Sequence, residues 1–400
     1  MMKYEKQIEL IANHLQNSET PESEYRIGIE IEHLIVHKND LSNVSYFEEN
    51  GIEDILVELS KKGWNPKYEE EHMIGLEKEK IDITLEPGGQ IEVSIVPEKQ
   101  LAPIVDIYKN FLKDIIPILD ENDELILTLG YLPVSLIEDI PLLPKKRYEY
   151  MYDYFKTNGK YAHNMMKGTA SIHVNLDFSN ESDYIRKNRV AYFLSPIIYS
   201  IFDNSPFFEG SRSDNNRVRG MVWDNCDQNR RGLMKKVFSS NFGYKEYAKY
   251  LLDLPPILTP ANNGVTYTKN KKLKDIINPD TITQKELKYF LTMFFPDVRS
   301  KDYIEIRMGD ALPYPFSMGY VAFWKGLLYN ENNLDLISQD IEKLGKDSII
   351  NLKNEILDKG FNFQIFGNDL IDYVNKLFDL AETNLNKMET DYLNLLRKII

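Results

Sequence analysis

Apolar and polar side chains alternate along several short segments of the chain, and this alternation predicts β-strands. The clearest segments are Ile27–Glu32, Ile81–Ile95, Ser171–Phe178 and Tyr303–Arg307. Because successive side chains of a strand point to opposite faces, isoleucine, valine and leucine occupy one face of each segment. The opposite face carries mostly acids, with a histidine and an arginine, where an ordinary half-buried sheet would carry Thr, Lys, Ser and Gln. The pattern therefore predicts a sheet with one apolar face and one face suited to chemistry.

The rest of the chain predicts helices and loops around this sheet. Helices are expected at residues 1–17, 52–62, 101–119, 146–158 and 187–203, a further strand at 126–132, a hairpin turn at 87–89, polar loops at 204–232 and 259–272, and mainly helices over 321–400. The second loop could be a mobile lid. No repeat or linker is visible, so we predict a single catalytic domain spanning residues 1–400. The hairpin and the alternating strands favour an α+β fold, in which helices cover one side of a largely antiparallel sheet.

The composition of this chain of 400 residues limits the classes of partner that it can bind. Its net charge of -14 argues against nucleic acid or an anionic membrane as the main partner. The only cysteine, Cys226, excludes an internal disulfide, which favours a reducing environment. Neither a signal peptide nor a transmembrane segment is expected, because charged residues interrupt the apolar runs. We therefore predict a cytoplasmic location.

The polar strand face predicts a metal site. Its candidate ligands are Glu30, Glu32, Glu86, Glu92, His173 and Glu305. Taken singly, each acid is more often a solvated side chain, and a lone histidine is more often a core residue. Taken together, like charges on neighbouring strands repel unless cations lie between them. Mg²⁺ and Mn²⁺ prefer carboxylate and phosphate oxygens, and Mn²⁺ tolerates an imidazole. No glycine-rich nucleotide-binding loop occurs in the sequence, so a bound nucleotide would have to be held through metal ions. The polar face therefore predicts two or three such ions that hold a triphosphate.

Arginines gather near the same segments. Arg212, Arg217, Arg219, Arg230 and Arg231 lie in the polar loop, and Arg299 and Arg307 lie near Glu305. Arginine binds carboxylates and phosphates through two parallel hydrogen bonds. Most of these side chains would be surface charges, so we predict only three or four of them in the site.

At these motifs the chain resembles glutamate–cysteine ligase, the enzyme of the first step of glutathione synthesis, in its plant and related bacterial branch. The matching strings are Gly28–Glu32, Leu85–Ser94, Val174–Phe178, Asn204–Gly210, Trp223–Gly232, Pro296–Arg299 and Tyr303–Arg307. They follow the family's order over residues 28–330, and the string Glu86-Pro-Gly-Gly-Gln90 followed by Glu92 is specific. The resemblance implies a glutamine-synthetase-like curved antiparallel sheet with a concave active face.

The resemblance also implies roles for individual residues. One metal set resembles Glu30, Glu86 and Glu92, and the other resembles Glu32, His173 and Glu305. Arg219 and Arg307 are implied as catalytic residues, and Arg219, Arg230, Arg299 and Trp223 as substrate-binding residues. Three features depart from the plant pattern: His173 stands in place of a glutamine, Met308–Ala311 differs, and Cys226 alone cannot form the plant disulfide.

The implied reaction joins the γ-carboxylate of L-glutamate to the amino group of L-cysteine. It uses ATP with Mg²⁺ or Mn²⁺, passes through γ-glutamyl phosphate, and needs no covalent enzyme nucleophile. The expected partners are therefore the small molecules glutamate, cysteine and ATP, and the oligomeric state is left open. Three alternatives stay open: a ligase with another amine acceptor, a phosphagen-type kinase, and a non-enzymatic metal or nucleotide sensor.

Overall fold

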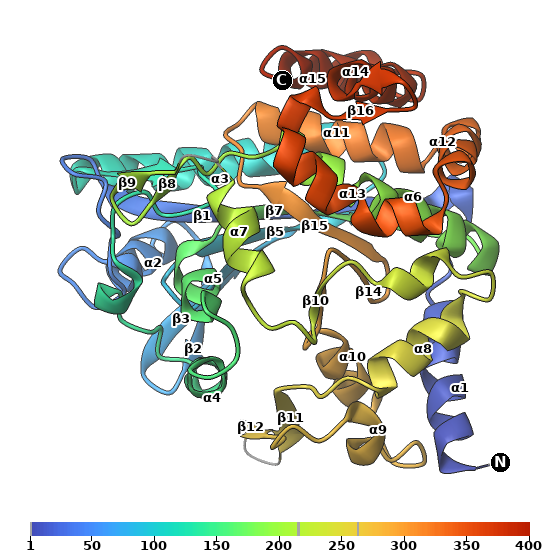
Figure 1. The fold of residues 1–400 in the computed structure, drawn as a ribbon. Helices are drawn as coiled ribbons and strands as arrows, with labels where there is room; N and C mark the ends of the chain where they lie inside the picture. The colour runs from blue at the N-terminus through green and yellow to red at the C-terminus, as the bar shows by residue number, and fades with distance from the viewer. Residues whose placement is uncertain (1, 214–216, 262–263) are drawn as a thin grey trace.

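A large antiparallel sheet forms the centre of the molecule in the computed structural model, which describes residues 2–213, 217–261 and 264–400 (Figure 1). Within these residues the sheet has nine strands, in the order β14-β15-β7-β1-β5-β4-β3-β2, and β6 pairs with β1. The strands are β1 (Ile27–His37), β2 (Asn65–Glu69), β3 (His72–Lys78), β4 (Ile81–Leu85), β5 (Ile91–Glu98), β6 (Glu124–Leu127), β7 (Ser171–Leu176), β14 (Val298–Ser300) and β15 (Ile304–Asp310). All of these pairs are antiparallel.

Helices cover the apolar face of the sheet. The helices α3 (Leu101–Glu121), α6 (Glu181–Ile201) and α11 (Phe316–Leu328) pack against the strands. The alternating side chains Ile29 and Ile31 are 1% and 0% exposed, since they lie in this core. Figure 1 shows α11 between the sheet and an outer pair, α14 (Leu370–Glu382) and α15 (Lys387–Arg397). Burial of the strands' apolar face therefore leaves the polar face on the other side.

Shorter elements surround the polar face. In Figure 1 the sheet bends toward β3 and β2, and α4 (Lys146–Phe155), α5 (Ala162–Gly168) and α7 (Val218–Asp224) lie on the concave side. The remaining helices are α1 (Lys3–Gln16), α2 (Ile52–Ser60), α8 (Tyr244–Leu252), α9 (Leu273–Ile276), α10 (Gln284–Leu291), α12 (Glu331–Leu344) and α13 (Lys346–Lys359). The short strand pairs are β8 (Phe207–Phe208) with β9 (Ser211–Arg212), β10 (Arg231–Gly232) with β13 (Phe295–Pro296), β11 (Leu258–Ala261) with β12 (Gly264–Tyr267), and β16 (Gln364–Ile365) with β17 (Asn368–Asp369).

The α+β prediction is confirmed, together with the curved antiparallel sheet. The predicted strand 126–132 is wrong in extent, because β6 ends at Leu127. It pairs only with the last residues of β1, and β7 already occupies that side of β1 over Ile27–Ile31.

The two segments predicted as loops are more ordered than expected. Residues 204–232 contain α7 and short strands, and residues 259–272 contain most of the β11–β12 pair. Residues 214–216 and 262–263 of these segments lie outside the described residues. Strands of two to four residues show too little periodicity to be detected from sequence.

The C-terminal segment is built mainly from α11 to α15, and the single catalytic domain over residues 1–400 stays a prediction. Of the helices in the described ranges, none combines the length and the apolar character required to cross a membrane.

Candidate active site

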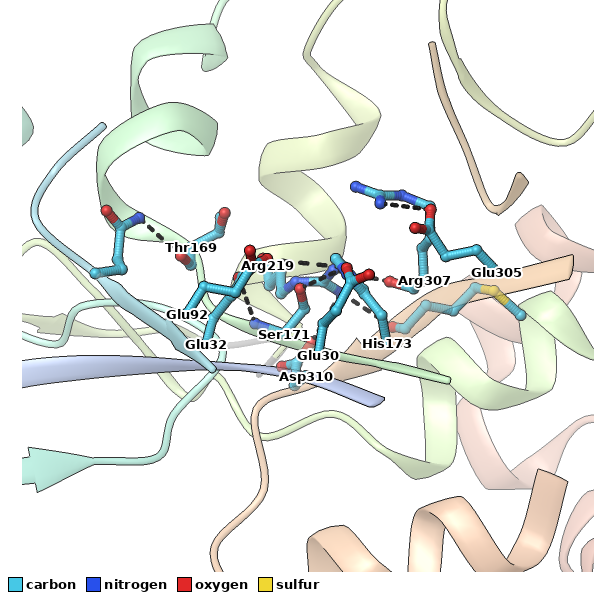
Figure 2. Close-up of polar contacts among 12 residues, drawn as sticks. Glu30, Glu32, Glu92, Thr169, Ser171, His173, Arg219, Glu305, Arg307 and Asp310 are labelled. Carbon is cyan, nitrogen blue, oxygen red and sulfur yellow. Dashed lines mark hydrogen bonds and ion pairs between the residues drawn. The ribbon is translucent and has the colours of Figure 1, made fainter. Parts of the chain in front are cut away.

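Strand register brings the polar side chains together. Glu30 of β1 lies opposite His173 of β7, and Glu32 lies opposite Glu92 of β5. His173 Nδ1 is 3.0 Å from Glu30 Oε2, and Asn175 Nδ2 donates to Glu30 Oε1 at 3.1 Å. Figure 2 shows Glu30, Glu32 and His173 on one side of the strands. The alternation seen in the sequence therefore assembles one continuous polar surface.

Neighbouring hydrogen-bond donors orient the carboxylates of Glu32 and Glu92. The backbone N–H of Ser171 donates to Glu32 Oε2 at 2.7 Å. The hydroxyl of Thr84 donates to Glu92 Oε1 at 2.7 Å. The Ser171 hydroxyl also lies 2.9 Å from His173 Nε2. These contacts hold the carboxylates and the imidazole in fixed positions beside one another.

Two groups of possible metal ligands result. One is Glu30, His173 and Glu305, the other is Glu32, Glu92 and His173, and in each group the ligand atoms lie within 4.8 Å of one another. This grouping differs from the two sets implied by the resemblance. The cross-strand register explains the difference, because Glu30 faces His173 and Glu32 faces Glu92. Glu86, in the turn after β4, lines the same cavity but belongs to neither group of the described residues.

Burial and repulsion dominate the electrostatics of Glu32 and Glu92. Burial, followed by the charge of Glu86, raises the pKa of Glu32 to about 7. Burial, followed by the charge of Glu30, also raises the pKa of Glu92 well above its ordinary value. In Glu30, by contrast, burial is outweighed by the hydrogen bond with His173 and the charge of Lys301, which lower the pKa to about 2. Burial lowers the pKa of His173 to about 4, so the imidazole is neutral at pH 7. Crowded acids beside a neutral imidazole form a donor set that fits a divalent cation.

Glu305 has a different environment. It is 0% exposed, and Arg299 Nε and Nη2 donate to its two carboxylate oxygens at 2.6 and 3.0 Å. Arg307 Nη1 donates at 2.9 Å, and Lys301 Nζ lies 2.7 Å away. Burial alone would raise the pKa of Glu305, but the charges of Arg299, Lys301 and Arg307 hold it well below its ordinary value. Glu305 is thus the counter-ion of a basic cluster, and it must exchange these partners before it binds a metal.

The polar face opens into a cavity of about 270 Å³. Eight predicted site residues line it: Glu30, Glu32, Glu86, Glu92, His173, Trp223, Arg299 and Arg307. The lining also includes the basic residues Arg147 and Lys301 and an apolar group formed by Tyr148, Met165 and Met166. One cavity therefore combines acidic, basic and apolar surfaces.

The sequence reasoning missed Arg147 and Lys301. Arg147 is the second residue of α4, and it ends the basic run Lys145-Lys146-Arg147 that could have indicated an anion site. Lys301 lies four residues before Glu305, where the two charges meet.

Two arginines predicted to bind substrate have other partners. Arg219 of α7 is 2% exposed and donates to the backbone oxygens of Met308 and Arg307, both at 3.0 Å. Arg230 is 0% exposed and donates to the hydroxyl of Tyr154 at 2.7 Å. Neither arginine is found among the described residues that line the cavity. The family resemblance implied both as substrate-binding residues; tertiary packing turns both side chains inward, and their substrate-binding role stays a prediction.

Trp223 and Cys226 lie near the same helix. Trp223 lines the cavity, and its indole Nε1 has no hydrogen-bond partner in the described part of the chain. Cys226 is 3% exposed, and burial raises the pKa of its thiol to about 12. The polar loop expected around Cys226 therefore encloses a buried thiol of low reactivity.

Comparison with known proteins identifies the family. The family model described as glutamate-cysteine ligase family 2 matches residues 26–359. The chain belongs to glutamate-cysteine ligase family 2. It is 32% identical over 387 residues to chloroplastic glutamate–cysteine ligase B of Oryza sativa subsp. japonica, which covers 95% of this chain and 77% of that protein. It is 31% identical to the chloroplastic enzyme of Nicotiana tabacum, over 94% of this chain and 74% of that protein.

A solved structure shares the fold of this family member. The glutamate–cysteine ligase of Francisella tularensis, solved in complex with AMP, superposes with a TM-score of 0.53 and 15% identity. The match covers 94% of this chain and 81% of that chain. The resemblance seen in the seven sequence strings is therefore confirmed for the family and for the fold.

The predicted cytoplasmic location is contradicted by the relatives. The enzymes of rice, tobacco and Arabidopsis thaliana are all named chloroplastic. The inference failed because a single cysteine excludes an internal disulfide but does not distinguish one reducing compartment from another.

Proposed function

We propose that this family member is an ATP-dependent glutamate–cysteine ligase, which joins the γ-carboxylate of L-glutamate to the amino group of L-cysteine. The observation that carries the proposal is a single cavity lined by the acids Glu32 and Glu92 and by the basic side chains Arg299, Lys301 and Arg307. The acids suit metal ions, and the basic side chains suit phosphate or carboxylate groups.

The metal ions are assigned to the strand acids. Glu30, Glu32, Glu92 and His173 are the proposed ligands, with Glu86 and Glu305 as further candidates. The burial of Glu32, which with the charge of Glu86 raises its pKa to about 7, supports this assignment, because a nearby cation stabilises a buried carboxylate. Mg²⁺ or Mn²⁺ bound there supplies the positive charge that a triphosphate needs.

The reaction proceeds in two steps without a covalent enzyme intermediate. An oxygen of the glutamate γ-carboxylate bonds to the γ-phosphorus of ATP while the bond to ADP breaks, which gives γ-glutamyl phosphate. The cysteine amine then attacks the carbonyl carbon, loses a proton and displaces phosphate. Arg299, Lys301 and Arg307 would stabilise the charge on the transferred phosphoryl group.

Substrate carboxylates need basic partners inside the cavity. Arg147 is proposed for this role, because it lines the cavity, whereas Arg299 is already assigned to the transferred phosphoryl group. Trp223, Tyr148 and Met165 would contact the apolar parts of the substrates. Arg219 is proposed to act indirectly, since it holds the backbone of β15 beneath Arg307.

A panel of amine acceptors tests the proposal. The protein is incubated with ATP, Mg²⁺ and glutamate, with each amino acid added in turn, and ADP, phosphate and dipeptide are measured. Cysteine should be the best acceptor, and ADP should accumulate only with metal and acceptor present. Formation of AMP and pyrophosphate would contradict the mechanism, and a phosphorylated amine without a dipeptide would indicate a kinase. The panel also detects a different acceptor, which the departures at His173 and Met308–Ala311 leave as the second candidate.

A further inference from the structure

A second group of metal-ligand side chains lies at the other end of β1. His37 is the last residue of β1, and Glu124, the first residue of β6, lies directly opposite. Glu48 comes from the segment 38–51, which connects β1 to α2. At about 3.3 Å per residue, His37 is about 16 Å along the strand from Glu32. None of the three residues is among the described residues lining the cavity, so the group is separate from the proposed active site.

The geometry of the three side chains resembles a metal-binding site. One nitrogen and two carboxylate oxygens lie within 4.8 Å of one another. His37 Nε2 and Glu48 Oε1 are 3.0 Å apart. In a tetrahedral zinc site with bonds of about 2.0–2.1 Å, neighbouring ligand atoms lie about 3.3 Å apart. The pair is therefore close to the spacing of two ligands on one ion, and Glu124 is near enough to become the third after a side-chain rotation.

Glu124 gives an independent reason to expect a cation. Its side chain is buried, with the residue 1% exposed, and its Oε2 has no hydrogen-bond partner in the described part of the chain. A buried carboxylate is unfavourable unless it is paired, protonated or bound to a metal. The neighbouring Lys38 is directed to another acid, because its Nζ donates to Asp120 Oδ1 at 2.7 Å.

We propose that His37, Glu48 and Glu124 bind one divalent transition-metal ion, for which Zn²⁺ is the best match. Zn²⁺ accepts mixed nitrogen and oxygen ligands in tetrahedral geometry and can keep a fourth position for water. Mg²⁺ prefers oxygen ligands in octahedral geometry, so it fits this set less well. The side chains of His37 and Glu48 are 34% and 33% exposed, which leaves a path from solvent. The ion ties the segment 38–51 to the sheet edge where β1 pairs with β6.

Zinc binding by the full chain tests this site through matched variants, because the cavity groups also contain an imidazole, that of His173, and can compete for Zn²⁺. Dialysis against graded Zn²⁺ followed by elemental analysis should reveal one Zn²⁺ per chain that the wild type binds and His37→Ala binds more weakly. Binding should weaken by at least roughly tenfold in His37→Ala and in Glu48→Gln. His72→Ala is the matched control and should bind like the wild type, since His72 also lies beside two acids, Glu53 and Glu71, and is 29% exposed.

A zinc-soaked crystal provides the second measurement. An anomalous peak within about 2.0–2.2 Å of His37 Nε2 and of the two carboxylates supports the site. Glu48 lies in a surface segment, so Glu48→Gln tests the ligand set without disturbing the core, and circular dichroism verifies its fold. Equal zinc binding by the wild type, His37→Ala and Glu48→Gln overturns the proposal, as does a peak confined to the cavity. Neither measurement depends on ligase activity.

Discussion

Replacing Glu305 by glutamine distinguishes two electrostatic roles among the strand acids. If Glu305 were one of several mutually repelling acids, as the sequence predicts, its neutralisation would stabilise the metal-free protein. In the structure it is the counter-ion of Arg299, Lys301 and Arg307. Glu305→Gln should therefore destabilise the protein. Burial and neighbouring charges raise the pKa of Glu92, so Glu92→Gln should not destabilise the protein.

The size of the effect follows from the burial of the ion pairs. Removing one partner of a buried pair costs about 3–5 kcal/mol, because the other charge stays buried without compensation. The entropy of unfolding is about 2.1 cal/mol/K per residue, or about 0.8 kcal/mol/K for a chain of 400 residues. Glu305→Gln should thus lower the Tm by about 4–6 °C. In Glu92→Gln the new amide oxygen can still accept from Thr84, so the Tm without metal should be equal to or higher than that of the wild type.

Calorimetry and steady-state kinetics on the same preparations make the comparison. Scans in EDTA give the metal-free Tm, and scans with Mg²⁺ and ATP give the stabilisation by ligand, which should shrink in Glu92→Gln. Both variants should lose on the order of 10²-fold in kcat, since each weakens stabilisation of the transferred phosphoryl group. A Glu305→Gln protein with an unchanged or raised Tm would refute the counter-ion argument. Near-wild-type kcat would remove Glu305 from the site altogether.

Three further predictions concern pH, Arg219 and Cys226. The pKa of Glu32 is about 7 in the folded protein against an ordinary 4.5, so without metal its contribution to stability is present below about pH 4.5 and is lost as the pH rises through 7. The wild-type Tm should therefore fall over this window relative to Glu32→Gln, and parallel Tm–pH curves would contradict the assignment. Arg219→Lys keeps the charge but not the fork that reaches the Arg307 and Met308 oxygens, so kcat should fall because Arg307 loses its position beside the transferred phosphoryl group, and an unchanged kcat would exclude this role. Cys226→Ser should retain activity, because the thiol is buried with a pKa near 12; reversible inactivation of the wild type by oxidation of this thiol would argue otherwise.

The main sheet was predictable because its two faces meet different surroundings. Ile29 and Ile31 pack against the helix layer, whereas Glu30 and Glu32 line the cavity. The sequence of β1 therefore alternates between apolar and polar residues. Elements such as β10 (Arg231–Gly232) carry no such signal, because two residues cannot show a period. Their structure comes from the strands and helices that they contact, which the local sequence does not reveal.

The candidate site was predictable only in part, because charge compensation depends on register. Alternation identifies Glu32 and Glu305 equally well as polar side chains of strands. Only the pairing of β14 with β15 places Arg299 opposite Glu305, and that contact converts an apparent metal ligand into a counter-ion. Glu32 lies opposite Glu92 instead, and burial, followed by the charge of Glu86, raises its pKa. The acids that resemble one another in sequence therefore differ: basic side chains already neutralise Glu305, whereas the raised pKa values of Glu32 and Glu92 fit the proposed binding of a cation.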